Sequence, residues 1–262
     1  MKFPKCACIE TLFTELPWAK RFRAAREAGF DLVEFWSWTD KDLDGVRDLA
    51  REAGVGVSGF NGDADYSLID PAHRRDYLSF LEKSLAAARK VGALSVTVHS
   101  NALGEGGLVA NHYPELSDTV KLCAMFDALR EGAPLAERAG VTLNLEALNI
   151  WVDHRGNYLS RTAMAAEICR LVDSPRLKVL YDVYHMQINE GNLCSTIAAH
   201  AAQFGHVHVA DVPGRHEPGT GEINYPRVFA CLEAAGYSGA VGYELVPKAG
   251  TDGAVRAIMA CG

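Results

Sequence analysis

Long hydrophobic runs and an excess of basic residues are both missing from this sequence. No apolar run approaches the roughly 20 residues that a membrane-spanning helix needs, and the first residues, MKFPKC, lack the apolar core of a secretory signal. We therefore expect a cytoplasmic protein with no membrane partner. Lys and Arg number 26 against 33 Asp and Glu, which gives a formal charge of −7. Because nucleic acids are bound through neutralised phosphates, we expect no nucleic-acid partner either.

Several short motifs are also missing. The seven cysteines are scattered and none forms C-x-x-C, which argues against a zinc knuckle or a dithiol redox motif. We expect most of them to be reduced and buried as small apolar residues. The sequence has no G-x-S-x-G and no H-E-x-x-H, so serine-hydrolase and zincin chemistry have no support. The glycine-rich segment LGEGGL at 103–108 matches no nucleotide-binding fingerprint, and we interpret it as a mobile lid.

What the sequence does contain is a regular alternation of two textures. Short runs of β-branched and aromatic residues predict strands, and longer amphipathic runs of Ala, Leu, Arg and Glu predict helices. The expected strands are 3–9, 31–36, 55–60, 95–99, 141–146, 177–182, 206–210 and 240–245. The expected helices are 17–28, 42–53, 73–91, 118–139, 160–172, 194–203, 226–235 and 252–260.

This alternation predicts the fold. Strands that alternate with helices form a parallel sheet, and eight such units in about 260 residues match the size of a (β/α)8 barrel. The alternative is an open doubly wound sheet, which usually carries a glycine-rich turn after an early strand. Here the first strand leads into ETLF, without glycine. We predict a single α/β domain over residues 1–262, a (β/α)8 TIM barrel.

Polar residues end four consecutive predicted strands. Glu146 ends the fifth, Asp182 the sixth and Glu244 the eighth, and His208 lies near the end of the seventh. In a barrel these positions converge at the C-terminal face, where active sites lie. Three carboxylates packed together would repel each other strongly unless a cation neutralised them. Oxygen-rich ligands with one nitrogen favour Mg²⁺ or Mn²⁺, so we predict that these four residues form a metal site.

Two of these carboxylates are also placed to act in general acid–base catalysis. Glu146 and Glu244 come from strands on either side of Asp182 and His208, so a substrate bound between them could lose a proton to one and regain it from the other. A metal ion holding a carbonyl and its neighbouring hydroxyl would stabilise the enediolate between the two transfers. This arrangement predicts a proton-transfer enzyme for α-hydroxy-carbonyl compounds.

Other polar residues near the predicted strand ends fit more than one role. Glu34 could steady a substrate hydroxyl or a metal ligand, or be an interior polar group, and the neighbouring Trp36 and Trp38 fit an apolar pocket wall or simple packing. His99 ends the fourth strand, where it could contact substrate or be structural. His206 lies deeper on the face of His208, where it could orient a ligand. The histidines at 154 and 216 fall in loops, where exposure is expected.

Several segments resemble the hydroxypyruvate isomerase family. The clearest is GHVHVADVPGRHEPGTGEINY at 205–225, followed by LYDVYHMQ at 180–187, LFTELP at 12–17 and AGFDLVEF at 28–35. This family belongs to the superfamily of xylose-isomerase-like TIM barrels, which also includes ketose 3-epimerases and apurinic endonucleases. The similarity runs from about residue 9 to residue 245.

The resemblance implies particular roles. Glu146, Asp182, His208 and Glu244 match the metal ligands of the superfamily, and the two glutamates match its proton-transfer pair. His185 matches a substrate-contacting histidine. Arg215 matches an arginine that reaches the substrate, and its planar fork suits a carboxylate. The implied reaction is hydroxypyruvate to tartronate semialdehyde with Mg²⁺ or Mn²⁺. Such barrels often form dimers or tetramers, so a homo-oligomer is one expected assembly.

Alternatives remain open within the superfamily. His208 stands where hydroxypyruvate isomerases often have Gln, and histidine there is typical of the epimerases. Val152, however, stands where epimerases usually carry a further glutamate. Ketose 3-epimerisation, 2-oxo-tetronate isomerisation and dehydration of a polyhydroxy ketone are therefore the alternative reactions. An endonuclease would need a basic groove and more histidines, and a sugar-binding barrel without activity would not need all four ligands.

Overall fold

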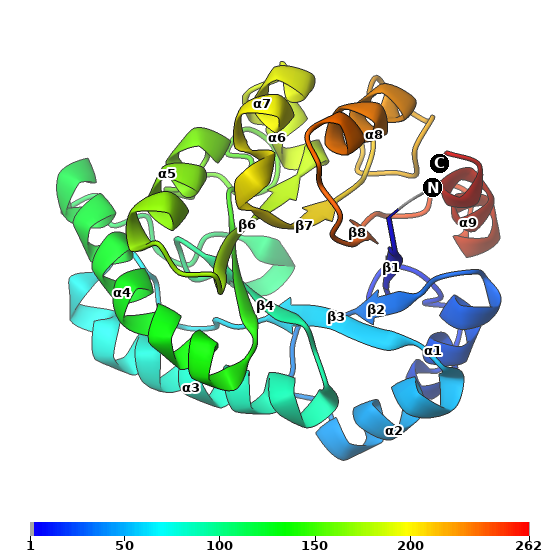
Figure 1. Cartoon of the computed structure of the whole chain (residues 1–262), viewed down its shortest axis with the longest axis horizontal. Coiled ribbons are helices and arrows are strands. Elements are labelled where there is room, and N and C mark those ends of the chain that lie inside the picture. The colour runs from blue at the N-terminus through cyan, green and yellow to red at the C-terminus, as the bar shows by residue number, and fades with distance from the viewer. Residues whose placement is uncertain (1–2, 262) are drawn as a thin grey trace.

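The computed structural model describes residues 3–261, and the strands within that range form a closed parallel barrel in sequence order, with β1 paired to β8. Figure 1 shows the strands at the centre of the molecule and the helices around them. The strands are β1 (Lys5–Cys8), β2 (Leu32–Glu34), β3 (Gly56–Asn61), β4 (Ser95–His99), β5 (Thr142–Glu146), β6 (Leu177–Asp182), β7 (Phe204–His208) and β8 (Val241–Tyr243). The predicted (β/α)8 barrel is confirmed.

The helices follow the strands as expected, with one addition. They are α1 (Trp18–Glu27), α2 (Leu43–Ala53), α3 (Arg74–Val91), α4 (Asp118–Ala139), α5 (Thr162–Val172), α6 (Val183–Asn189), α7 (Leu193–His200), α8 (Tyr225–Ala234) and α9 (Thr251–Ala260). Short 3₁₀ turns occur at η1 (Pro71–His73), η2 (Glu105–Gly107) and η3 (Ala201–Gln203). Helix α6 was not predicted from the sequence.

Local signals explain where the helices start and stop. The side chain of Ser117 accepts a hydrogen bond from the backbone N–H of Val120 and caps the start of α4, since the first N–H groups of a helix have no partner inside it. Helices α3 and α4 end at Gly92 and Gly140, whose φ angles of 73° and 69° are left-handed. Glycine adopts this conformation without a steric penalty.

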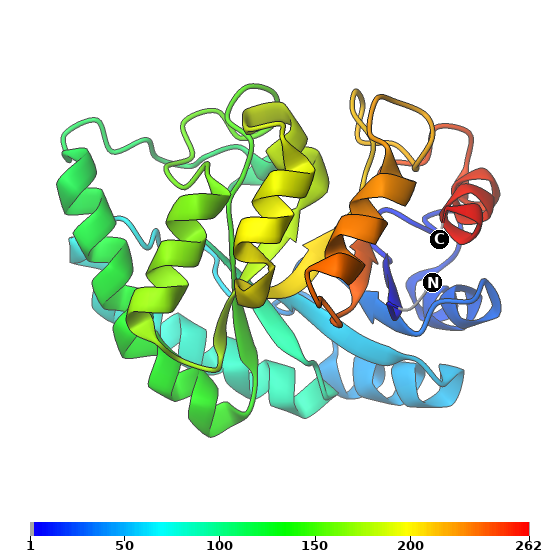
Figure 2. The same cartoon turned by 45° about the horizontal axis from the view of Figure 1, so that its top comes forward.

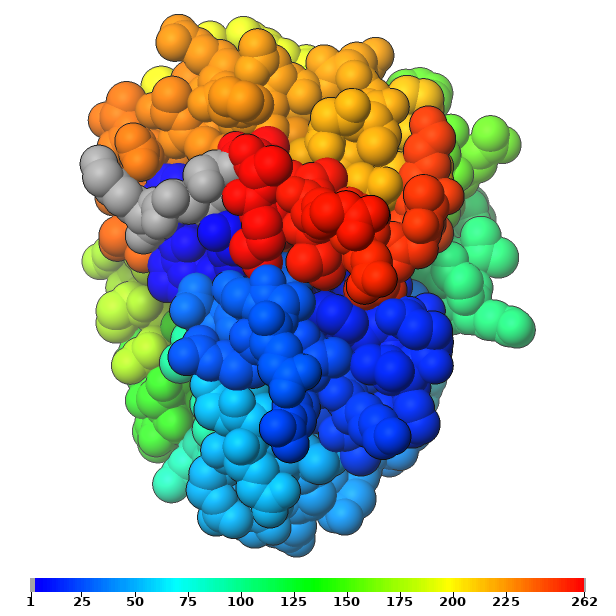
Figure 3. Space-filling view, turned by 90° about the vertical axis from the view of Figure 1, so that its right-hand side faces the viewer, coloured from blue at the N-terminus to red at the C-terminus, as the bar shows by residue number. Residues whose placement is uncertain are grey.

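The last helix completes the wall of the barrel. Figure 3 shows α9 wedged between the N-terminal segments and the segment around α8. Ala254 and Ile258 of α9 are fully buried, and the hydroxyl of Thr251 accepts a hydrogen bond from the backbone N–H of Phe13. The C-terminal helix therefore packs against the first βα unit.

The cysteines depart partly from expectation. Cys6, Cys8 and Cys169 are free and buried, as predicted. Cys194 in α7 and Cys231 in α8, however, form a disulfide with a Cα–Cα distance of 5.6 Å. This pair could not be predicted from the sequence, because the two cysteines are 37 residues apart and meet only when the two helices pack side by side.

The loops after the strands are long on one side only. Those that follow β4, β5 and β7 gather at the C-terminal end of the barrel, on the upper side of Figure 2. The returns from helix to strand are short. Among residues 3–261, no helix combines the length and the apolar character needed to cross a bilayer.

Candidate functional site

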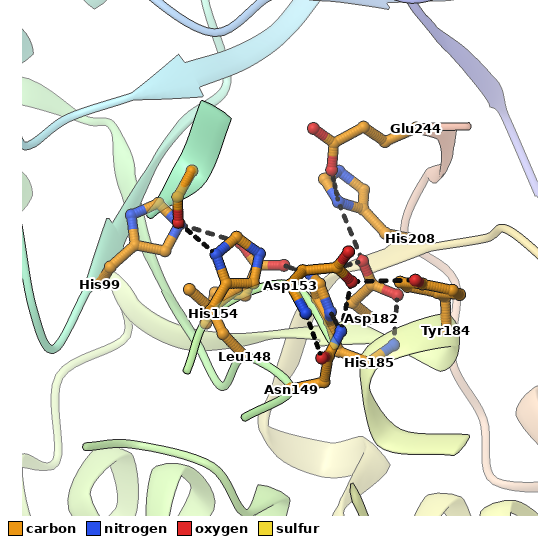
Figure 4. A network of polar contacts seen from close by, with 12 residues as sticks. His99, Leu148, Asn149, Asp153, His154, Asp182, Tyr184, His185, His208 and Glu244 are labelled. Atoms are coloured by element: carbon orange, nitrogen blue, oxygen red, sulfur yellow. Dashed lines mark hydrogen bonds and ion pairs between the residues drawn. The ribbon is translucent and has the colours of Figure 1, made fainter. Parts of the chain in front are cut away.

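The C-terminal ends of the strands carry the polar residues of the site. Glu34, His99, Glu146, Asp182 and His208 are the last residues of their strands, and Glu244 directly follows β8. The barrel register aligns His99 with Glu146 and Asp182 with His208. Figure 4 shows His208 and Glu244 approaching Asp182 from one side and His185 from the other.

Three of these residues form a compact cluster. One ligand atom each of Glu146, Asp182 and His208 lie within 4.8 Å of one another, and all three residues are buried. Burial, together with the charge of Glu146, raises the pKa of Asp182 to about 7, although Arg215 opposes the shift. The raised pKa shows that the ionised form of Asp182 is poorly compensated by the protein alone.

The donor atoms of this cluster fit a divalent cation. Among the described residues 3–261, Oε1 of Glu146 and Nδ1 of His208 are buried without a hydrogen-bond partner. A buried polar atom without a partner costs about 1–3 kcal/mol, and both atoms lie at the cluster. A set of carboxylate oxygens with one imidazole nitrogen suits hard divalent ions such as Mg²⁺ and Mn²⁺.

Glu244 lies beside the cluster and has three neighbours. Its Oε2 accepts a hydrogen bond of 2.6 Å from Nη2 of Arg215 and lies 3.4 Å from Nδ1 of His208. Its Oε1 accepts a hydrogen bond of 2.6 Å from the indole N–H of Trp36. Burial opposes ionisation, but Arg215 and His208 hold the pKa of Glu244 well below its usual value. Glu244 is therefore ionised at neutral pH.

Arg215 reaches the site from the loop between β7 and α8. Its guanidinium lies 5.3 Å from the ring centroid of Tyr184 and 3.7 Å from Oδ2 of Asp182. The loop is held by Asp211, whose carboxylate accepts hydrogen bonds from the backbone N–H groups of Val212, Gly219, Gly221 and Ile223. Asp211 thus fixes the loop that presents the arginine.

His185 lies on the first turn of α6, directly after Asp182. The Nδ2 atom of Asn149 lies 2.7 Å from Nδ1 of His185, so the amide donates and the opposite nitrogen, Nε2, carries the ring proton. Nε2 lies 3.5 Å from Oδ2 of Asp182 and 4.0 Å from Oε1 of Glu146. Burial, and then the charge of Arg215, hold the pKa of His185 well below its usual value. His185 is therefore a neutral donor at the edge of the cluster.

Glu34 lies under the two histidines of β7. Its oxygens are 3.2 Å from Nε2 of His208 and 3.0 Å from Nε2 of His206. Although burial acts in the opposite direction, His208 and His206 lower the pKa of Glu34 to about 2. Gly242 leaves the space that these side chains occupy. A Cβ at position 242 would lie 2.6 Å from Oε1 of Glu34 and 2.7 Å from Nε2 of His206.

His99 and His154 line the opposite wall. His99 lies between Asp63 and Glu146, with 3.1 Å from Nδ1 to Oδ1 of Asp63 and 3.1 Å from Nε2 to Oε2 of Glu146. Burial lowers the pKa of His99, but the two carboxylates outweigh it and raise the value to about 10. The expectation that His154 is exposed is wrong, because the loop after β5 folds inward and its Nδ1 donates to the carbonyl of Gly107.

These residues surround a cavity of about 500 Å³. The cavity extends from the cluster to the aromatic side chains of Trp36 and Trp38, which follow β2, and of Phe60 in β3. The lining residues that bear on the chemistry are Glu34, Trp36, Phe60, Asp63, His99, Glu146, His154, His185, His208, Arg215 and Glu244. The structure therefore brings the residues singled out in the sequence around one cavity, with Asp182 directly beside it. Sequence reasoning missed Asp63 and Asn149 and placed His154 outside the site, because all three lie in loops.

The fold and the cluster together define the class of protein. It is a (β/α)8 barrel with a candidate divalent-metal centre at the C-terminal ends of its strands. The chain belongs to the xylose isomerase-like TIM barrel family, whose model matches residues 22–261. The sequence motifs resemble those of the hydroxypyruvate isomerase family, and the relatives confirm this resemblance.

Among the relatives, the chain is similar to the 2-oxo-tetronate isomerase of Pectobacterium atrosepticum, with 32% identity over 95% of this chain and 94% of that protein. It is 34% identical to a putative hydroxypyruvate isomerase of Streptomyces coelicolor, over 91% of this chain and 89% of that one. A solved structure titled AP endonuclease, family 2, from Brucella melitensis matches with a TM-score of 0.83 and 30% identity, covering 96% of each chain.

Proposed function

We propose that this protein is a divalent-metal-dependent isomerase that converts hydroxypyruvate to tartronate semialdehyde through an enediolate. The observation that carries the proposal is the buried cluster of Glu146, Asp182 and His208, in which Oε1 of Glu146 and Nδ1 of His208 have no hydrogen-bond partner within residues 3–261. The names of the relatives support an isomerase of a short 2-oxo acid.

The residues that would hold the metal ion are Glu146, Asp182, His208 and Glu244. Their oxygen-rich character favours Mg²⁺ or Mn²⁺. When bound, the ion supplies the Lewis acidity that polarises the substrate carbonyl and its neighbouring hydroxyl. Glu34 steadies the His208 imidazole from its far side, at 3.2 Å from Nε2, as partners of metal-ligating histidines commonly do.

The side chains of the site divide the proton transfers between them. One of the pair Glu146 and Glu244 removes a proton from C3 of hydroxypyruvate and later releases it to solvent, and the other takes up a proton from solvent and delivers it to C2. The hydroxyl proton on C3 moves to the oxygen on C2, so the 3-hydroxyl becomes an aldehyde, the 2-carbonyl becomes a hydroxyl, and no atom is gained or lost. General acid–base catalysis of this kind contributes about 10²–10⁴-fold in rate.

The remaining residues bind and orient the substrate. Arg215 presents a planar pair of N–H groups to the substrate carboxylate, in exchange for part of its contact with Glu244. Neutral His185 donates from Nε2 to a substrate oxygen, because its Nδ1 is occupied by Asn149. His99 lies on the same cavity wall, where its ring can pack against the substrate while its nitrogens stay with Asp63 and Glu146.

A second candidate is the isomerisation of a 2-oxo-tetronate. The observation that favours it is the size of the cavity, about 500 Å³, which exceeds what a three-carbon acid fills. Space remains between the cluster and the aromatic wall formed by Trp36 and Phe60. A fourth carbon with its hydroxyl would extend into this space, and the relative from Pectobacterium atrosepticum carries that substrate in its name.

Proton NMR in D₂O tests the proposal directly. Purified protein is incubated with hydroxypyruvate in the presence of Mn²⁺ or Mg²⁺, and then with EDTA. We expect metal-dependent formation of tartronate semialdehyde with deuterium at the carbon that receives the proton. Solvent exchange without net conversion would reject hydroxypyruvate and keep the proton-transfer chemistry, and the 2-oxo-tetronate is then the next substrate. Neither exchange nor conversion of either acid by folded, metal-loaded protein would refute the proposed function.

A further inference from the structure

Asp63 lies in the loop after β3, two residues beyond the end of the strand, and is directed at the site. Its side chain is only 7% exposed. One of its carboxylate oxygens accepts a hydrogen bond from the backbone N–H of His99, and the other lies 3.1 Å from Nδ1 of the same residue. Asp63 thus contacts both the backbone N–H and the ring of His99.

The far side of the ring contacts a predicted proton-transfer residue. Nε2 of His99 lies 3.1 Å from Oε2 of Glu146, and the imidazole is 4% exposed. Both ring nitrogens of His99 therefore face a carboxylate oxygen at hydrogen-bond distance. The result is a continuous chain from Asp63 through His99 to Glu146, of which Figure 4 shows the imidazole of His99 at the edge of the network.

The two oxygens of Glu146 differ as a consequence. Oε2 is bonded to His99, whereas Oε1 has no hydrogen-bond partner among the described residues and lies 4.0 Å from Nε2 of His185 at the cluster. A carboxylate anchored by one oxygen presents the other in a fixed direction. A small rotation of the Glu146 side chain would move Oε1 away from Asp182 and His208.

We propose that Asp63 is a positioning residue that acts through His99 to fix the orientation of Glu146. This inference rests on the proposed function for its catalytic consequence, since Glu146 is there both a metal ligand and a proton carrier. The geometry of the chain itself does not depend on the substrate. Groups that orient ligating side chains typically contribute about 10–100-fold to metal affinity or activity.

Asp63→Asn tests the proposal with minimal change of shape. The asparagine oxygen can still accept from the backbone N–H of His99, while the amide NH₂ meets Nδ1 as a donor and ends the carboxylate contact. We expect kcat to fall about 10–100-fold and the Mn²⁺ dissociation constant to rise by a similar factor, with a smaller change in KM. The matched control is Asp65→Asn, an exposed carboxylate in the same loop, which should leave all three values within twofold.

A double mutant separates positioning from general support of the fold. If Asp63 acts through His99, then Asp63→Asn in a His99→Gln background should cost no further loss in kcat, because the intermediary is already gone. If the losses in the two single variants instead multiply in the double variant, Asp63 acts independently of His99 and the proposal is refuted. A kcat and a Mn²⁺ affinity of Asp63→Asn within twofold of the wild type would refute it as well.

One readout does not require turnover. If Asp63→Asn failed to fold, the Mn²⁺ affinity of His99→Gln tests the same chain of contacts, and an affinity within twofold of the wild type would overturn the proposal. The Mn²⁺ affinities likewise decide the role of Asp63 if the wild type converts neither acid. In that case the proposed function fails, but a weaker Mn²⁺ affinity of Asp63→Asn would still support the positioning role.

Discussion

Each buried carboxylate of the site has its own counter-charge, with one exception. Glu244 is paired with Arg215, Glu34 with the two histidines of β7, and Glu146 with His99. The exception is Asp182, which shares Arg215 with Glu244 and whose burial raises its pKa to about 7. A poorly compensated buried charge is costly, so Asp182 is the residue whose ionised form gains most from a bound cation.

Glu244 is the residue whose replacement most directly tests the proton-transfer chemistry. Glu244→Gln keeps the size and the hydrogen-bonding reach of the side chain but removes its ability to carry a proton. We expect kcat for the isomerisation to fall about 10²–10⁴-fold, with an unchanged circular dichroism spectrum. Steady-state kinetics at saturating Mn²⁺ measure this loss, and Glu52→Gln on the exposed face of α2 is the control. A kcat within twofold of the wild type would exclude Glu244 as a proton carrier.

Residues at strand ends could be predicted from the strand pattern, whereas the loop residue Arg215 was expected only from the family resemblance and the other loop residues of the site were missed. Glu146, Asp182 and His208 end runs of strand-forming residues, and a parallel barrel aligns such ends whatever the details of packing. Asp63 and His154 reach the cavity only because their loops fold inward. Nothing in the local sequence fixes the path of these loops, which depends on contacts such as that between His154 and the carbonyl of Gly107.

At the scale of elements, the prediction depends on length and periodicity. The eight longer helices were predicted because each repeats an apolar face over several turns. Helix α6 has only seven residues and begins directly after β6, so the sequence offers no separate pattern for it. Its N-cap is Asp182, whose side chain accepts a hydrogen bond from the backbone N–H of His185. A predicted metal ligand thus also starts the helix that positions a predicted substrate contact.

The loop from β7 to α8 provides a prediction at this scale. Both oxygens of the fully buried Asp211 accept hydrogen bonds from backbone N–H groups of the loop that carries Arg215. In Asp211→Asn, the amide NH₂ would face two of these donors, and leaving buried donors unpaired costs about 1–3 kcal/mol. We expect a lower free energy of unfolding in urea and a raised KM for hydroxypyruvate, because Arg215 is less well held.

The control for this variant is again Asp65→Asn, which removes a carboxylate from an exposed position. An Asp211→Asn protein with wild-type stability and wild-type KM would show that the loop is held by other contacts. Reduced stability with an unchanged KM would confine Asp211 to a structural role.

At the scale of the whole molecule, closure of the barrel assembles the site from both ends of the chain. Trp36 follows β2 and bonds to Glu244 after β8, a separation of 208 residues, and Glu34 meets His206 across 172 residues. Such pairs exist only once β1 has paired with β8. The site therefore reports on the integrity of the whole fold, and binding at the site stabilises the whole fold.

Metal removal tests this coupling. An ion that binds the native barrel and not the unfolded chain raises the free energy of unfolding by about 2.7 kcal/mol at a concentration 100 times its dissociation constant. For a chain of this size, that corresponds to a rise in melting temperature of roughly 5–10 °C. We expect differential scanning calorimetry to show this rise when Mn²⁺ is added to EDTA-treated protein. The rise should be smaller for Asp182→Asn, which lacks the carboxylate that most needs the cation.

Because removing the buried charge of Asp182 also relieves its desolvation cost, the metal-free Asp182→Asn protein should melt at or above the temperature of the metal-free wild type. Equal melting temperatures of the wild type with and without Mn²⁺ would contradict a metal site in the barrel, whatever the substrate.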